Sequence, residues 1–196
     1  AAGDGILLID QSEAPDRRAL AEHVQARADD RVQHVEDAAR GLPAGRNLAV
    51  SRCSTPVIWF IDDDVVLRPG ALAAMRAAFA DPSVGGAVGR IEERRVRLHA
   101  GPPRLRVGWD GRVRQRILGL HDGALPMLAG GSFAARVVAL RAVGPCDAGF
   151  GGTAFLEDAD WSTRLRRAGW RLRYASGSVV VHLAAPRAGC RVPDRA

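Results

Sequence analysis

The 196-residue chain contains no lysine, so all 28 of its Lys-or-Arg residues are arginine. Aromatic residues make up only 5% of the sequence, and no run of arginines is interleaved with rings on which the bases of a single strand could stack. The net charge of +6 therefore indicates a compositional bias toward arginine, and we expect no nucleic-acid partner. The positive charge remains compatible with contact to anionic lipid or to an anionic substrate.

Cysteine is also scarce, and long apolar runs are missing. The three cysteines, Cys53, Cys146 and Cys190, are far apart and odd in number, which fits neither a disulfide framework nor a zinc site. No stretch approaches the roughly 18 to 20 unbroken apolar residues of a membrane span. None has the order of a signal peptide. With 47% hydrophobic residues the chain can build one substantial core. The cysteine pattern makes a reducing compartment the simplest setting, so we expect a cytoplasmic protein.

Apolar runs alternate with helical patterns along the first half of the chain. Apolar or alternating runs typical of strands occupy residues 5–10, 31–36, 57–61 and 84–91. Helical patterns lie between them, in residues 14–30, 41–54 and 68–82. This order predicts an α/β fold, with a mostly parallel sheet flanked by helices in a single domain.

The pattern changes over residues 92–126, which are rich in Arg, Gly and Pro. Such a long stretch suggests an excursion from the sheet, with one hairpin near residues 109–112. Regular patterns then return, and they predict a turn leading into a helix at 129–144, a helix at 157–169, and strands at 170–175 and 178–183.

Three consecutive aspartates, Asp62, Asp63 and Asp64, follow the apolar run 57–61. Like charges crowded in this way repel one another, and they are costly to desolvate. Alternate residues of an extended segment share a face, so Asp62 and Asp64 can offer two carboxylates to one hard cation beyond the carboxyl end of a strand. Asp10 ends the first apolar run in the same manner. A helix cap or a solvated turn would account for one of the three consecutive aspartates, but not for all three.

A second acidic group, Glu157, Asp158 and Asp160, opens the helix expected near residue 157. The helix dipole favours carboxylates there, and Asp160 can pair with the arginine four residues later. Asp158 would suit a general base opposite a metal site, with a dipole cap as the equal alternative. His182 ends the last apolar run; it is structural unless its strand lies beside the aspartates, where imidazole would be a metal ligand.

Taken in order, residues 41–72, 128–152 and 155–183 resemble the family 2 glycosyltransferases with the GT-A fold. These segments read "GLPAGRNLAVSRCSTPVIWFIDDDVVLRPGAL", "LAGGSFAARVVALRAVGPCDAGFGG" and "FLEDADWSTRLRRAGWRLRYASGSVVVHL". The resemblance implies transfer of a sugar from a nucleotide-diphosphate donor to an acceptor hydroxyl, inverting and dependent on Mn²⁺ or Mg²⁺. It also implies a glycan or lipid-linked acceptor, a role in polysaccharide or glycolipid synthesis, and peripheral contact with the inner face of a membrane.

The same resemblance implies a role for each candidate residue. Asp64 would be a metal ligand, His182 a second one, and Asp158 the base that deprotonates the acceptor. Donor nucleotide contacts would come from Asp10, Arg46, Asn47, Asp62 and Asp63. The sugar and acceptor would be lined by Gly130, Gly131 and Glu157.

The resemblance also implies how the chain is divided into parts, and two alternative functions stay open. Residues 1–190 would form one domain, with a nucleotide-binding half at 1–91, a variable loop or hairpin at 92–126, an acceptor or catalytic half at 127–190, and a tail at 191–196. Family members normally begin with a strand, turn and helix that have no counterpart ahead of the first apolar run. A GT-A-like scaffold without catalysis therefore stays open, as does a phosphatase of the haloacid dehalogenase kind, which also places Asp-x-Asp after a strand.

Overall fold

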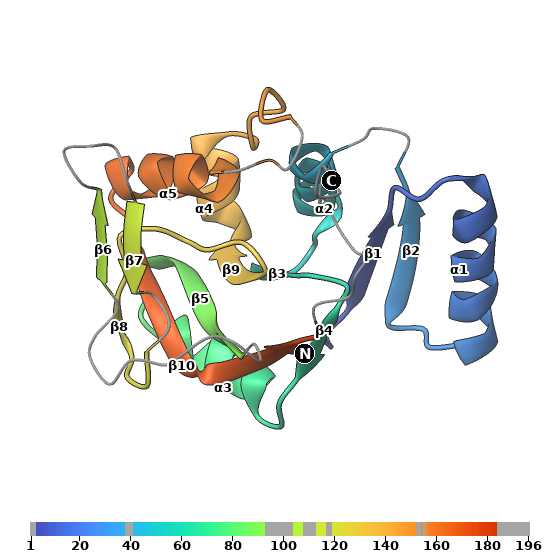
Figure 1. Ribbon diagram of the computed structural model, residues 1–196, viewed down its shortest axis with the longest axis horizontal. Coiled ribbons are helices and arrows are strands. Elements are labelled where there is room, and N and C mark those ends of the chain that lie inside the picture. Colours follow the sequence, from blue (N-terminus) through green and yellow to red (C-terminus); the bar gives the residue numbers. More distant parts are fainter. Residues whose placement is uncertain are drawn as a thin grey trace, which may run out of the picture.

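The computed structural model describes residues 3–37, 41–92, 104–107, 113–116, 119–151, 154 and 156–183 (Figure 1). Its elements in chain order are β1 (Ile6–Asp10), α1 (Ala14–Arg27), β2 (Val32–Glu36), α2 (Leu42–Arg52), β3 (Val57–Ile61), β4 (Val65–Leu67), α3 (Ala71–Ala78), β5 (Val84–Glu92), β6 (Arg104–Val107), β7 (Val113–Arg116), β8 (Gly123–Ala124), β9 (Ser132–Arg136), α4 (Val137–Val143), α5 (Glu157–Arg167) and β10 (Arg171–His182).

A six-stranded sheet forms the centre of the molecule, in the order β3-β9-β5-β10-β4 with β8 beside β10. Helices α4 and α5 lie over one face of this sheet and α3 over the other (Figure 1). The predicted α/β class, with helices flanking a central sheet, is therefore confirmed. The predicted strand direction needs correction, because only β1–β2 and β5–β10 are parallel neighbours among the described strands.

The antiparallel pairs come from two strands, β9 and β4, that sequence patterns did not predict. Residues 132–136 contain no β-branched residue and were expected to belong to a turn leading into a helix, yet they form β9 antiparallel to both β3 and β5. Strand β4 is only three residues long and pairs antiparallel with β10, at the opposite end of the strand order from β3. Strands β3, β5 and β10 still share one direction.

The remaining predictions near the sheet need smaller changes. The two closing strands expected at 170–175 and 178–183 are one strand, β10, with an irregular register between Ala175 and Val179. The expected hairpin is present as the antiparallel pair β6–β7, while its turn at 109–112 lies outside the described residues.

The core follows from the alternation of side chains along the strands. On β9, Phe133 and Ala135 face the layer of α4 and α5, whereas Ala134 faces Met75 on α3. Phe133 packs against Phe60 and Trp161, with ring centres 4.9 and 6.4 Å away respectively. The sheet is therefore buried on both faces, which fixes the carboxyl ends of its strands in place.

Helix α2 connects the central sheet with the separate β1–β2 pair. In the described part of the chain, β1 pairs only with β2, and β3 pairs only with β9. A Cβ at Gly45 of α2 would lie 3.6 Å from Ile9 of β1, while Arg46 on the same helix covers the Phe60 ring of β3. None of the helices that the structure describes combines the length and apolar character of a membrane span.

Candidate active site

The three predicted carboxylates directly follow strand β3, and the structure brings two of them to one histidine. Because β10 pairs antiparallel with β4, His182 lies opposite Val65, directly after the aspartate turn. His182 Nε2 is 3.1 Å from Asp64 Oδ1 and 3.8 Å from Asp62 Oδ2. One atom from each of these three side chains lies within 4.8 Å of the others, so they form a candidate metal centre.

The electrostatics of this cluster fit a divalent cation. Burial, followed by the charge of Asp64, raises the pKa of Asp62, and the nearby His182 and Arg46 only partly oppose the rise. Asp64 is 8% exposed, so it is buried more deeply than Asp62, whose side chain is 40% exposed. Two crowded carboxylates with an imidazole nitrogen make a donor set suited to Mn²⁺-like ions, whose charge would offset the repulsion.

The predicted base, Asp158, lies in the first turn of α5. Its Oδ2 accepts a hydrogen bond of 2.6 Å from the backbone N–H of Gly130. Burial raises the pKa of Asp158, although the hydrogen bond from Gly130 and the charge of Arg46 act in the opposite direction. The side chain therefore has a fixed direction and a proton affinity above that of an ordinary aspartate, as a general base requires.

Gly130 and Gly131 form a turn between the two acidic groups. Gly131 has a φ of +62°, and a Cβ there would lie 3.2 Å from Asp62 Oδ2. A Cβ at Gly130 would lie 3.7 Å from Asp158 Oδ2. The backbone N–H of Asp62 also donates to the carbonyl of Gly131, at 3.2 Å. The structure thus brings Asp62, Asp158 and both glycines together at one place.

The side chains of Arg46 and Asn47 have partners within the protein. The guanidinium of Arg46 donates to the carboxylate of Glu157, and both residues are buried. The amide of Asn47 exchanges two hydrogen bonds with the backbone of Cys146, at 2.8 and 2.7 Å. Direct contact of Arg46 or Asn47 with a donor stays a prediction. Asp63, the third aspartate, is exposed.

Asp10 forms a separate polar group at the end of β1. It is 2% exposed, its Oδ1 accepts from the N–H of Ser12 at 2.8 Å, and its Oδ2 lies 2.9 Å from His34 Nε2. Burial would raise the pKa of Asp10, but the hydrogen bonds from Ser12 and the contact with His34 outweigh it and leave the pKa low. Sequence reasoning gave His34 no role. Parallel pairing of the runs 5–10 and 31–36 was the signal that could have found it.

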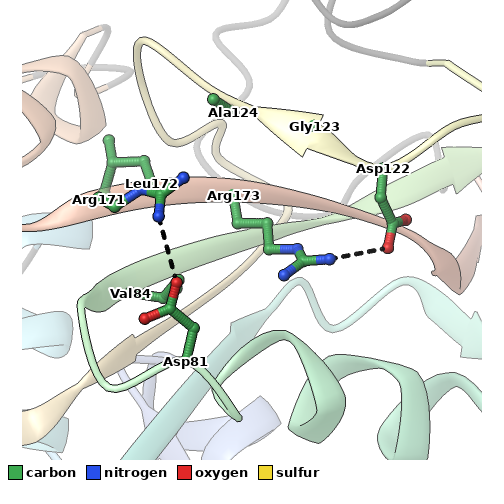
Figure 2. Close-up of a pocket in the computed structure, with 8 residues that line it drawn as sticks. All are labelled: Asp81, Val84, Asp122, Gly123, Ala124, Arg171, Leu172 and Arg173. Carbon is green, nitrogen blue, oxygen red and sulfur yellow. Dashed lines mark hydrogen bonds and ion pairs between the residues drawn. The ribbon is translucent and has the colours of Figure 1, made fainter.

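A depression of about 270 Å³ lies elsewhere, at the start of β5 and β10 (Figure 2). It is lined by Asp81, Val84, Asp122, Gly123, Ala124, Arg171, Leu172 and Arg173. Its charges pair with one another at the surface, Arg171 with Asp81 at 3.3 Å and Arg173 with Asp122 at 3.5 Å. Because His182 is at the other end of β10, this depression is separate from the acidic groups.

The site thus consists of a candidate Asp–Asp–His metal centre after β3 and a carboxylate at the start of α5, on a mixed sheet flanked by helices. The sequence profile of glycosyl transferase family 2 matches residues 4–144, and the chain belongs to this family. Its sequence is 31% identical over 150 residues to the pre-mycofactocin glycosyltransferase of Mycobacterium tuberculosis, in two strains. The match covers 73% of this chain and 30% of the relative, so the chain spans about a third of the length of these relatives.

Solved structures of glycosyltransferases share the fold. GalNAc-T7, determined with UDP, GalNAc and Mn²⁺, superposes with a TM-score of 0.74 at 19% identity, over 91% of this chain and 37% of that one. The mannosyltransferase PcManGT from Pyrobaculum calidifontis, determined with GDP-Man and Mn²⁺, gives a TM-score of 0.65 at 16% identity, over 93% and 48%. The predicted GT-A fold is therefore confirmed.

Proposed function

We propose that this chain forms a metal-dependent glycosyltransferase domain that moves a sugar from a nucleotide-diphosphate donor to an acceptor hydroxyl. One observation carries the proposal: the turn of Gly130 and Gly131 places Asp158 beside the cluster of Asp62, Asp64 and His182. Sugar transfer needs charge neutralisation at the leaving group and proton removal at the acceptor. Two neighbouring acidic groups with different environments suit that division of work.

Asp64, Asp62 and His182 are the residues that would hold Mn²⁺ or Mg²⁺. A bound divalent cation supplies the positive charge that offsets the diphosphate leaving group. The likeness to GalNAc-T7 and PcManGT, each determined with Mn²⁺ and a nucleotide or nucleotide sugar, supports this role. The fixed turn at 62–64 holds the two carboxylates toward His182, so little reorganisation is needed when a cation arrives.

Asp158 would take the proton from the acceptor hydroxyl. Its hydrogen bond from Gly130 holds the carboxylate in one direction, and its burial raises its pKa and thus strengthens it as a base. A base that activates the acceptor directly favours a single displacement with inversion at the anomeric carbon.

The remaining candidate residues would contact the donor or the acceptor. For the nucleotide we propose Asp10, Asn47, Asp62 and Asp63, and for the sugar and acceptor Gly130 and Gly131. The expected donor contact of Arg46 and acceptor contact of Glu157 are left out of this proposal, because these buried side chains pair with each other. A glycan or lipid-linked hydroxyl would be the acceptor, in polysaccharide or glycolipid synthesis. The arginine-rich composition suits peripheral contact with the anionic inner face of a membrane.

Calorimetric titration with UDP, GDP and dTDP, each with and without Mn²⁺, tests the proposal. We expect one nucleotide to bind, and only when Mn²⁺ is present, which would also identify the donor base. A folded chain that binds none of the three would contradict the proposal and favour a scaffold domain. Release of phosphate from an aryl phosphate would instead favour the phosphatase alternative.

A further inference from the structure

A buried ion pair joins helix α2 to the start of helix α5. Arg46 is 5% exposed and Glu157 is 3% exposed, and the guanidinium of Arg46 donates to Glu157 Oε1. The guanidinium carbon also lies 4.9 Å from the ring centre of Phe133 and 5.8 Å from that of Phe60. A buried charge is costly unless it is paired, so Glu157 and the two rings fix Arg46 in one position away from water.

The start of α5 depends on contacts with other elements. In the described part of the chain, no side chain caps this helix, and its N-cap residue Leu156 has a φ of +72°. Two contacts hold the first turn instead. Arg46 binds Glu157, and the N–H of Gly130 binds the carboxylate of Asp158, the next residue. Glu157 Oε2 makes no hydrogen bond with a described residue, so the contact of Oε1 with Arg46 is its anchor.

The backbone of Asp158 is held independently, one turn further along. Ser162 Oγ donates to the carbonyl of Asp158 at 2.5 Å and accepts from the N–H of Leu128 at 2.7 Å. This link ties α5 to the segment that precedes Gly130, one turn beyond the contact of Glu157 with Arg46.

We propose that Arg46 and Glu157 form a positioning pair that aims the carboxylate of Asp158 at the site, without contacting the donor or the acceptor. The inference rests on the proposed function, because it serves a base that this function requires. Arg46 holds Glu157 in place, and the side chain of the adjacent Asp158 then projects toward Gly130. The charge of Arg46 also keeps the pKa of Asp158 below the value that burial alone would give.

Glu157→Gln probes the pair directly, because it keeps the shape of the side chain and an acceptor for Arg46 while removing the charge. We expect kcat to fall about 10- to 100-fold, since small displacements of a catalytic group cost this much, with the donor Kd changed less than about twofold. Asp160→Asn makes the same chemical change on the same helix, where the partner is Arg164. This control should keep the wild-type kcat.

The double variant Arg46→Met, Glu157→Leu separates positioning from folding. Removing both charges leaves no lone buried ion, so its Tm should stay near that of the wild type. Its kcat should stay low, because neither new side chain fixes the first turn of α5. Wild-type kcat in this variant would overturn the proposal, as would a weakening of donor binding large enough to account for the loss of turnover.

Hydrogen exchange at the Gly130 amide tests the pair without turnover. This amide binds Asp158 Oδ2, so it should exchange about tenfold faster in Glu157→Gln than in the wild type, and unchanged in Asp160→Asn. Faster exchange in Glu157→Gln, together with no nucleotide binding by the wild type, would support the positioning pair and contradict the proposed function. Unchanged exchange in Glu157→Gln, together with Mn²⁺-dependent nucleotide binding by the wild type, would contradict the positioning pair and support the proposed function.

Discussion

Two aspartates of this chain show how environment decides the chemistry of one residue type. Asp10 is buried and Asp158 is partly buried, and burial raises the proton affinity of each. At Asp10, the hydrogen bonds from Ser12 and the contact with His34 reverse that effect, so the pKa falls below its ordinary value. At Asp158, burial prevails and the pKa rises. Asp10 therefore suits a permanent acceptor of hydrogen bonds, and Asp158 suits a proton carrier.

Asp158→Asn should remove turnover and leave donor binding intact. The amide can still accept the hydrogen bond from Gly130, so the fold of the first turn should persist, but it cannot take a proton. Loss of a general base costs about 100- to 10,000-fold in kcat. Steady-state kinetics together with calorimetric binding of the nucleotide would measure both effects. Retained turnover would contradict the assignment of the base.

The pH dependence of kcat should report the raised pKa of Asp158. The base must be ionised, so kcat should fall as the pH drops through a pKa above the value of about 3.9 typical of aspartate. The charged groups around it are Glu157 on its own helix and Arg46 on α2, and Arg46 favours the ionised form. A wild-type profile without an acid limb, over the range in which the protein stays folded, would count against this prediction.

Gly131→Ala tests the turn between the acidic groups. The methyl group would meet Asp62 Oδ2 at 3.2 Å, in addition to the strain of a φ of +62°. Gly70→Ala is the matched control, because Gly70 also has a positive φ, +82°, but has nothing within 4 Å of the added carbon. Both variants should lose about 1 to 2 kcal/mol of unfolding free energy in urea. Only Gly131→Ala should weaken Mn²⁺-dependent nucleotide binding; equal binding by both variants would show that the turn does not shape the site.

At the scale of elements, helix α5 is held by a second arginine. Arg164 pairs with Asp160 at 2.7 Å and also donates to the carbonyl of Val143 at 2.7 Å, at the end of α4. An ordinary pair four residues apart on a helix surface stabilises little, but this arginine also satisfies carbonyls that a helix end leaves unpaired. Arg164 therefore connects α5 to α4.

Arg164→Ala should lower the free energy of unfolding by about 2 kcal/mol, because charge-assisted bonds to two elements are lost. Arg18→Ala is the control. Arg18 forms the same kind of pair with Glu22 on α1, but its side chain is 83% exposed and touches no other element in the hydrogen bonds described. That change should cost less than about 0.5 kcal/mol. Equal losses in urea denaturation would show that the contact with α4 adds nothing.

The elements differ in how far the sequence could predict them. Strands β1 and β3 were predictable because each is a continuous apolar run ending in aspartate, and α5 because acidic residues begin it and arginines end it. Strand β9 was not, since it contains no β-branched residue and its pairing with β3 and β5 makes it a strand. Tertiary pairing, which no local pattern encodes, decided the mixed direction of the sheet.

For the whole molecule, the sequence identified both acidic groups but not the connection between them. Crowded aspartates after a strand, and acidic residues at a helix start, are local signals. The turn that brings Asp62 close to Asp158, and the burial of Arg46 against Glu157, join segments separated by about a hundred positions. Such contacts arise only when α2 and α5 pack on the same sheet. This is why the structure changes the expected role of Arg46 more than that of Asp64.

The most direct test of the account is Mn²⁺-dependent nucleotide binding by Asp64→Ala, measured by calorimetry beside the wild type. Asp16→Ala, an exposed aspartate on α1, is the control for losing one negative charge. We predict that the wild type and Asp16→Ala bind one nucleotide with Mn²⁺, and that Asp64→Ala, folded to the same extent, loses that binding. Binding by Asp64→Ala that still depends on Mn²⁺ and matches the wild type would contradict the proposed metal centre.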